Sequence, residues 1–334
     1  MSDRDPLLSA LDTVPDPVTG KGLVTSGRAS AARLEGSRAD AIVDVAGLAA
    51  GDRAALESAA RAALLAVPGV TEARVLLTAD RPARRIVAIA SGKGGVGKST
   101  VAANVAVALA RMGRKVGLVD ADIYGPSQPR LFDAHDRPDA KDKIMFPVPT
   151  RWGVPILSMG QLIEPGKAIA WRGPMAAGAL SQLVDAHWGD TELLILDLPP
   201  GTGDVQLTMI QKHRPVGAII VSTPQDLALI DATRAIDLFF KADIPVIGLV
   251  ENMAGYACPH CGEISDPFGQ GGAEAEAQAL GLPFLGRIPL ARGIRSASDA
   301  GTPPAAGDDA DAAPFRAIAE RLDAWLNPSP SPVF

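Results

Sequence analysis

The first 80 residues contain one stretch with the apolar spacing of a helix and two short runs typical of strands. Between residues 51 and 66 apolar residues recur every three or four positions, the spacing of one helical face, which predicts a helix. Strand-like runs lie on either side of it, at 41–45 and 73–77, and a Pro-Gly turn at 68–69 separates helix and second strand. This pattern predicts a small α/β domain over residues 1–80.

Beyond residue 85 the pattern changes to short runs that are apolar at nearly every position. Such runs indicate strands buried on both faces, and helical segments at 173–187 and 227–241 lie between them. We therefore expect an α/β fold with a doubly wound, mostly parallel sheet. The predicted strands are Ile86–Ala90, Lys115–Val119, Leu193–Leu196, Gly217–Val221, Val246–Val250 and Phe284–Ile288.

Proline and charge mark the ends of this second region. A charged stretch with a proline runs from Asp80 to Arg85, and we place a linker at 81–85. The second domain is then expected over 86–327. The proline-rich tail at 328–334 is expected to be disordered.

Charge and hydropathy restrict the classes of partner. The 334 residues carry a formal net charge of −6, with no long run of Lys or Arg, so we expect no nucleic-acid partner. The N-terminus lacks a cationic segment followed by an apolar stretch, and no run of about 18 apolar residues occurs. We therefore expect a cytoplasmic protein that does not bind membranes.

The last predicted helix has one apolar face. Phe315, Ile318, Leu322 and Trp325 share that face, which resembles a membrane anchor. Its opposite face mixes acidic and basic residues instead of being cationic, so packing into the core is the favoured interpretation.

The segment GKGGVGKS at 92–99 follows a predicted strand and opens a predicted helix. This is the P-loop pattern in its required context, in which backbone amides wrap phosphate oxygens at a helix N-terminus. Lys98 is expected to reach the terminal phosphates and Ser99 to coordinate Mg²⁺. The residues expected to bind the nucleotide here are Gly92, Lys93, Gly94, Gly95, Val96, Gly97, Lys98, Ser99 and Thr100.

Carboxylates follow two of the predicted strands. Asp120 and Asp122 follow the strand that ends at Val119, and Asp197 follows Leu196 in the segment DLPPGTGD. Strand C-termini of a doubly wound sheet face the nucleotide crevice. Asp197 therefore fits the Walker B arrangement, which holds Mg²⁺, and the amide of Gly201 is expected to reach the γ-phosphate.

The chain contains two cysteines, Cys258 and Cys261, three positions apart in CPHC. Two such thiolates can bind one soft metal centre, yet they supply only half of a four-thiolate shell. A twofold dimer supplies four. An iron-sulfur cluster is the favoured occupant, while zinc, a redox pair and unengaged thiols stay open as alternatives, and His260 is interpreted as a spacer.

Lys93, just after the first glycine of the P-loop, is similar to the signature lysine of the deviant Walker A ATPases. The resemblance implies that Lys93 reaches across a homodimer to the partner's ATP. It also implies that Asp122 orients the attacking water, that Asp120 supports the Mg²⁺ shell and that Asn252 contacts adenine.

In combination, the motifs GKGGVGKST, DADIYGPS, WRGPM, DLPPGTGD, STPQDLAL, ENM and CPHC resemble the Mrp/ApbC family of iron-sulfur cluster carrier ATPases. The resemblance covers residues 85 to about 327. It implies a slow Mg²⁺-dependent ATPase that holds a bridging 4Fe-4S cluster in a homodimer, receives it from a donor and transfers it to acceptor apoproteins. The N-terminal region resembles the small iron-sulfur assembly domain, with DPVTGKGLV at 16–24 as the main landmark.

Two other functions share this fold class. A positioning ATPase of the MinD or ParA kind needs a membrane-binding or DNA-binding surface, whereas the cysteine pair favours cluster transfer. A nitrogenase-like reductase takes its bridging cysteines from separate positions in the chain, which fits a lone CxxC poorly.

Overall fold

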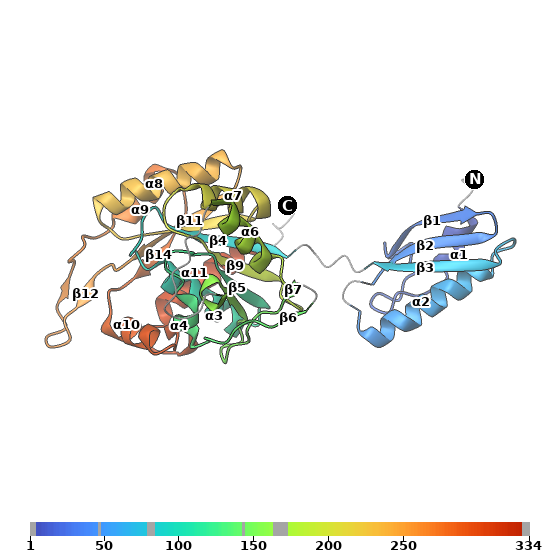
Figure 1. Ribbon diagram of the computed structural model, residues 1–334, viewed down its shortest axis with the longest axis horizontal. Coiled ribbons are helices and arrows are strands. Elements are labelled where there is room, and N and C mark those ends of the chain that lie inside the picture. Colours follow the sequence, from blue (N-terminus) through green and yellow to red (C-terminus); the bar gives the residue numbers. More distant parts are fainter. Residues whose placement is uncertain (1–4, 46–47, 79–83, 142–143, 163–172, 329–334) are drawn as a thin grey trace, which may run out of the picture. The chain divides into compact units, whose positions relative to one another are not determined.

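A computed structural model describes residues 5–45, 48–78, 84–141, 144–162 and 173–328 (Figure 1). Contacts divide the chain into two compact units, Met1–Ala83 and Arg84–Phe334. Most of the predicted linker at 81–85 and of the predicted tail at 328–334 lies outside the described residues, as does the first part of the WRGPM motif.

The N-terminal unit is a three-stranded sheet packed against two helices. Its strand order is β1-β2-β3, antiparallel between β1 and β2 and parallel between β2 and β3. Along β2, Ala39, Ala41 and Val43 are buried while the residues between them are more exposed, the pattern of a sheet with one covered face. The elements are α1 (Pro6–Leu11), β1 (Ala29–Glu35), β2 (Arg38–Asp44), α2 (Ala50–Leu65) and β3 (Glu72–Thr78).

A buried carboxylate organises the loop that carries the landmark motif of this unit. Asp16 is 2% exposed and pairs with Arg28, with 2.6 Å between Oδ1 and Nε. It also accepts hydrogen bonds from the Val18 amide and the Thr19 hydroxyl. Burial alone would raise the pKa of Asp16, but these hydrogen bonds and the guanidinium charge hold it below its usual value.

The larger unit is built on a seven-stranded sheet in which every neighbouring pair is parallel. Its order is β14-β11-β10-β4-β9-β5-β8, which confirms the predicted doubly wound α/β class. Residues on β5, β9 and β10 are buried on both faces. The strands are β4 (Arg85–Ala90), β5 (Val116–Asp120), β8 (Ile156–Ser158), β9 (Leu193–Asp197), β10 (Gly217–Ser222), β11 (Val246–Asn252) and β14 (Phe284–Ile288).

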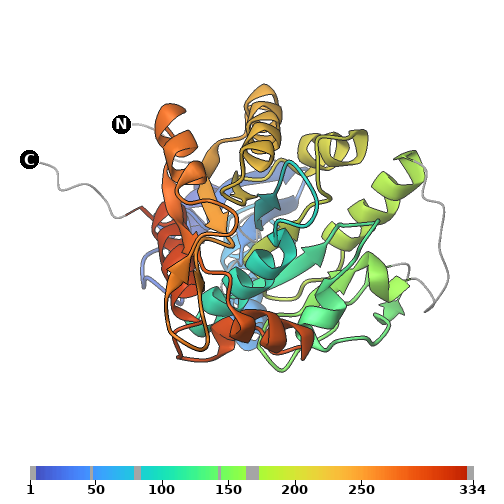
Figure 2. The same cartoon turned by 90° about the vertical axis from the view of Figure 1, so that its left-hand side faces the viewer.

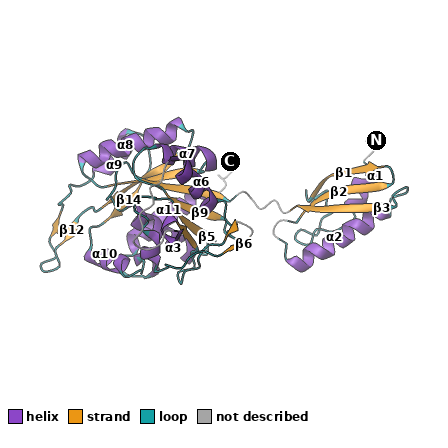
Figure 3. Ribbon diagram, viewed as in Figure 1, coloured by secondary structure: helices purple, strands orange, loops and turns teal. Residues whose placement is uncertain are grey.

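Helices cover both faces of this sheet and enclose two separate hydrophobic clusters (Figures 1 and 3). One face carries α3 (Lys98–Arg111), α4 (Gln128–Phe132), α10 (Arg292–Asp299) and α11 (Ala313–Leu326). The other carries α6 (Gly173–Val184), α7 (Asp204–His213), α8 (Asp226–Lys241) and α9 (Gly272–Ala279). Short helices α5 (Met159–Leu162) and η1 (Pro304–Ala306) complete the unit.

Several expected elements differ in extent or were not anticipated. The helix expected at 173–187 ends at Val184. At that end the Leu183 carbonyl accepts a hydrogen bond from the indole of Trp188. Strand β8 has three residues, too few for a recognisable period. Two ribbons were also missed, β6 (Ala140–Lys141) with β7 (Ile144–Met145) and β12 (Tyr256–Ala257) with β13 (Ile264–Ser265).

The C-terminal helix packs as its apolar face predicts. Phe315, Ile318 and Leu322 are fully buried, whereas Trp325 is 38% exposed. In the part of the chain that the structure describes, no helix combines the length and apolar character needed to cross a membrane.

Two adjacent phenylalanines on α8 provide a test of this packing. Phe239 is fully buried and Phe240 is 48% exposed. Phe239→Ala should lower the unfolding free energy of the larger unit by about 3–5 kcal/mol, because it leaves a cavity, while Phe240→Ala should cost less than about 1 kcal/mol. Denaturant unfolding followed by tryptophan fluorescence measures this unit, since all four tryptophans belong to it. Equal losses in the two variants would contradict the assigned orientation of α8.

Candidate functional site

The P-loop connects β4 to α3 and depends on three glycines for its shape. Gly95 and Gly97 both have φ of +82°, a backbone conformation that side chains disfavour. A Cβ at Gly97 would lie 2.1 Å from Nδ2 of Asn252, and one at Gly92 would lie 2.0 Å from the backbone of Asp231 on α8. The loop therefore approaches both β11 and α8 more closely than any larger residue allows.

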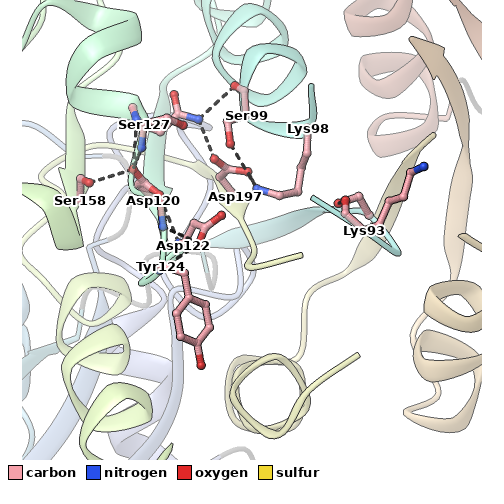
Figure 4. Close-up of polar contacts among 12 residues, drawn as sticks. Lys93, Lys98, Ser99, Asp120, Asp122, Tyr124, Ser127, Ser158 and Asp197 are labelled. Atoms are coloured by element: carbon pink, nitrogen blue, oxygen red, sulfur yellow. Dashed lines mark hydrogen bonds and ion pairs between the residues drawn. The ribbon is translucent and has the colours of Figure 1, made fainter. Parts of the chain in front are cut away.

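An ion pair joins the first turn of α3 to the end of β9. Nζ of Lys98 lies 2.5 Å from Oδ1 of Asp197 and 3.2 Å from Oγ of Ser99 (Figure 4). Lys98 is 6% exposed and Asp197 is fully buried. The structure thus brings together Lys98, expected at the phosphates, with Ser99 and Asp197, both expected to hold Mg²⁺.

Gln128 is a site residue that the sequence analysis missed. Its Nε2 donates to Oδ2 of Asp197 at 2.8 Å and to the carbonyl of Ser99 at 3.0 Å. Its Oε1 is buried without a hydrogen-bond partner among the described residues. Gln128 follows the quoted motif DADIYGPS directly, so its proximity to the two carboxylate strands was the available signal.

Asp120 lies at the end of β5, behind this ion pair, and is fully buried. Its Oδ2 accepts hydrogen bonds from the amides of Ser127 and Gln128, each at 3.0 Å, and from Oγ of Ser158 at 2.8 Å (Figure 4). Asp120 therefore positions the segment that carries Gln128. That Asp120 supports the Mg²⁺ shell stays a prediction. Because its oxygens accept these hydrogen bonds, such support would act indirectly, through the 127–128 segment.

The electrostatic setting of Asp120 favours its neutral form. Burial raises the pKa of the Asp120 carboxyl to about 7, and the negative charge of Asp197 acts in the same direction. The hydrogen bonds that Asp120 accepts and the positive charge of Lys98 oppose this shift only in part.

Asp122, after β5, and Lys93, in the P-loop, are two further residues expected to act on the nucleotide. Oδ1 of Asp122 accepts hydrogen bonds from the amides of Tyr124 and Gly125, both at 3.1 Å, which closes a turn after β5. The side chain of Lys93 points away from Lys98 and Asp197 (Figure 4), and its expected reach to a partner's ATP stays a prediction.

A pocket of about 260 Å³ lies over the P-loop. The amide of Gly201, expected at the γ-phosphate, donates instead to the carbonyl of Ser91 at 2.9 Å. A contact between Gly201 and phosphate thus requires this loop to rearrange. Residues lining the pocket include Ser91, Lys93, Gly97, Lys98, Asp122 and Pro200.

Asn252 ends β11 beside the P-loop. Its Nδ2 donates to the carbonyl of Val96 at 2.8 Å, and the residue is 8% exposed. The next residue, Met253, has φ of +60°, which is uncommon for a side chain of its size. Asn252 contacts the loop that would hold the phosphates, and its expected contact with adenine stays a prediction.

The cysteines lie at the tip of the β12–β13 hairpin, on the side of the unit that Figure 2 faces. The amide of Cys258 donates to the Glu263 carbonyl and the amide of Gly262 to the Cys258 carbonyl, each at 2.9 Å. Cys258 is half-buried and Cys261 exposed. Hydrogen bonds from the amides of Cys261 and His260 lower the pKa of the Cys258 thiol, favouring its thiolate form.

Residues 82–323 match the profile of a family described as the NUBPL iron-transfer P-loop NTPase. The chain belongs to the NUBPL iron-transfer P-loop NTPase family. Residues 4–75 of this NTPase match a second family, described as iron-sulfur cluster assembly protein.

Curated relatives of the NTPase carry names of the same kind. The iron-sulfur cluster carrier protein of Deinococcus radiodurans is 44% identical over 333 residues, 96% of this chain and 94% of the relative. That of Methanocaldococcus jannaschii is 45% identical over 240 residues, 71% of this chain and 83% of the relative.

Solved structures agree with the fold of the NTPase. The nucleotide-binding protein of Archaeoglobus fulgidus in complex with ADP is 40% identical with a TM-score of 0.58, covering 65% of this chain and 86% of that one. The septum site-determining protein MinD of Pyrococcus horikoshii with Mg-ADP is 25% identical with a TM-score of 0.54, covering 73% and 97%.

The raised pKa of Asp120 predicts a specific dependence of stability on pH in the ligand-free protein. Between pH about 4 and about 7 the folded chain binds a proton at Asp120 that the unfolded chain has released, so this group's contribution to stability falls as pH rises. The unfolding free energy of Asp120→Asn minus that of wild type, both measured by denaturant titration, should increase from pH 5 to pH 8. The exposed Asp237→Asn serves as control, and a parallel pH profile for Asp120→Asn and wild type would contradict the argument.

Proposed function

We propose that this chain is a Mg²⁺-dependent ATPase that carries an iron-sulfur cluster between two copies of itself and delivers it to acceptor apoproteins. One observation supports this combination above all. The only two thiols of the chain lie at the tip of an exposed hairpin, which begins four residues after Asn252, the side chain bonded to the P-loop.

The chain's own residues fit the nucleotide step. Lys98 offers a cation at the P-loop, and ATP can draw it from Asp197 because phosphate oxygens carry more negative charge than one carboxylate. Asp122 is proposed to orient the attacking water, and the turn that it closes with Tyr124 and Gly125 supports a fixed position for its carboxylate.

Mg²⁺ fits the oxygen donors on this edge of the sheet. The Ser99 hydroxyl and the Asp197 carboxylate are hard oxygen ligands of the kind that Mg²⁺ takes beside phosphates. Oε1 of Gln128, which is buried and has no hydrogen-bond partner in the described part of the chain, lies on the side chain that bonds Asp197. When bound, the ion neutralises charge on the phosphates, while Gln128 and Asp120 hold Asp197 and the 127–128 segment in place.

In the proposed function the cluster is cargo that two copies of the chain hold between them. Two thiols in one chain leave half of a four-thiolate shell unfilled, and no group of three or more candidate metal ligands occurs within the described ranges. The outward direction of Lys93 supports the same arrangement, in which a twofold partner completes both the cluster site and the nucleotide site.

Short connections support coupling between the two ligands. Asn252 contacts Val96 of the P-loop, and the amide of Ala254 then donates to Ile288 of β14 at 3.0 Å. The adjacent Glu251 is fully buried, bonded to Arg287 at 3.0 Å and to the first amides of α9. A shift of Asn252 on nucleotide binding would therefore reach the hairpin, which begins at Tyr256, across three residues, and any such linkage is reciprocal.

The nucleotide assignment is tested with two lysine variants. Lys98→Ala should lower kcat for phosphate release by about 10²–10³-fold, the range for removing one charge-stabilising group. Lys241→Ala removes an exposed lysine on α8 and should leave the rate unchanged. Steady-state phosphate release with Mg-ATP gives both values, and an unaltered rate in Lys98→Ala would remove the assigned site.

The cargo assignment is tested by counting iron. Anaerobic reconstitution should give about four irons and four sulfides per dimer, because one cubane satisfies four thiolates. Cys258→Ser and Cys261→Ser should each lose the cluster, since two ligands disappear per dimer, yet keep the ATP affinity of cluster-free wild type. Iron and sulfide analysis, visible absorption and light scattering provide the measurements. A monomer with a full cluster, or a double variant that retains one, would refute the bridging site.

A further inference from the structure

One face of the N-terminal sheet is left open by the helices of its unit. Helices α1 and α2 pack against the opposite face, where Ala39, Ala41 and Val43 of β2 join their hydrophobic cluster. On the open face Ile42 and Leu76 are exposed and lie opposite each other in neighbouring strands. Within the described part of this unit, that face is therefore uncovered.

The strand register arranges six charged residues of the open face in two rows, because residues directly opposite in neighbouring strands share a face. The first row, the cationic row, consists of Arg33, Asp40 and Arg74. The second row, the anionic row, consists of Glu35, Arg38 and Glu72. The charges alternate within each row and between the two rows, so they form a checkerboard that crosses all three strands.

The checkerboard is only partly paired within its own sheet. Its central arginine, Arg38, contacts Glu35 at 3.1 Å and Asp40 at 3.3 Å. Three other charges are exposed and form no ion pair with any residue that the structure describes. These are Arg33, Glu72 and Arg74. Their charges are thus available to another molecule.

We propose that the open face binds the same face of a second copy of the chain, about a twofold axis that lies between the two rows and runs parallel to them. Each charge of one copy then faces the opposite charge of the other copy in the corresponding strand. The facing pairs are Arg33 with the partner's Glu35, Asp40 with the partner's Arg38, and Arg74 with the partner's Glu72. The twofold symmetry forms each of these pairs twice.

The charge pattern selects this arrangement. Face-to-face sheets lie about 10 Å apart, a distance that an arginine and a carboxylate side chain bridge together. A twofold axis parallel to the strands would instead place Asp40 over the partner's Asp40 and Arg33 over the partner's Arg74, and like charges repel. In the proposed arrangement Ile42, two residues beyond Asp40, lies over the partner's Gly36, which has open space beside its backbone.

The contact is small, which gives it a supporting role. Three strands spaced about 4.8 Å apart offer much less than the roughly 800 Å² per partner of a standard interface. We therefore expect weak association that added salt weakens further. Such a contact keeps two copies near each other when neither nucleotide nor cluster joins them, and so raises the effective concentration of their half-sites.

The full chain with Cys258→Ser/Cys261→Ser, at low salt and without nucleotide, isolates this contact because it lacks the thiols that would hold a cluster. In that background Arg74→Glu should raise the dimer Kd about tenfold, since the symmetry turns two attractive pairs into repulsive ones. Adding Glu72→Arg exchanges the two charges and should restore the Kd. Arg61→Glu, the same change on the exposed side of α2, should leave it unaltered. Sedimentation equilibrium provides the Kd values.

The exchange variant is decisive, because within one copy it puts like charges side by side, so restored association reports only the contact between copies. A monomer at every concentration would overturn the inference, and so would equal Kd values for Arg74→Glu and Arg61→Glu. An exchange variant that is folded by circular dichroism but does not recover the Kd would also overturn it. None of these results bears on the carrier function, since the background binds no cluster, and a recovered Kd would stand even if wild type assembled none.

Discussion

The ion pair between Lys98 and Asp197 is the contact around which the nucleotide site is arranged. Removing one partner of such a buried pair costs about 3–5 kcal/mol, because the remaining charge keeps its desolvation penalty. Asp120 lies nearby with most of its hydrogen-bonding capacity engaged by protein donors. One cation thus faces two carboxylates, and a protonated Asp120 reduces the imbalance. Loss of that proton leaves these three side chains with a net charge of about −1, which a bound cation can neutralise.

Charged and polar side chains link the loops that surround this ion pair. Gln128 connects Asp197 to the backbone of α3 at Ser99, and Ser158 brings the end of β8 to Asp120. A ligand that redistributes charge among these groups acts on three strand ends at once. This is a physical basis for a switch, because a carboxylate that moves must change the hydrogen bonds that it makes to the other strand ends.

Much of the fold was predictable from local pattern, and the site only in part. Buried parallel strands are apolar at nearly every position, so six of the seven were found, while β8 has three residues and no measurable period. The P-loop was evident because its spacing, strand and helix coincide. Gln128 and Ser158 were missed because their partners lie 29 to 69 positions away. The state of Gly201, whose amide bonds Ser91, depends on tertiary contacts that no spacing encodes.

The cysteine hairpin has a consequence for how this protein can change over time. It is paired through two residues on each strand, and none of residues 256–266 is buried. Substitutions of the exposed side chains at its tip therefore carry a small folding penalty, whereas those around Lys98 disturb a buried charge network. Selection can therefore change the side chains of the tip while the residues around Lys98 stay the same. The hairpin can thus diverge among relatives faster than the nucleotide site does.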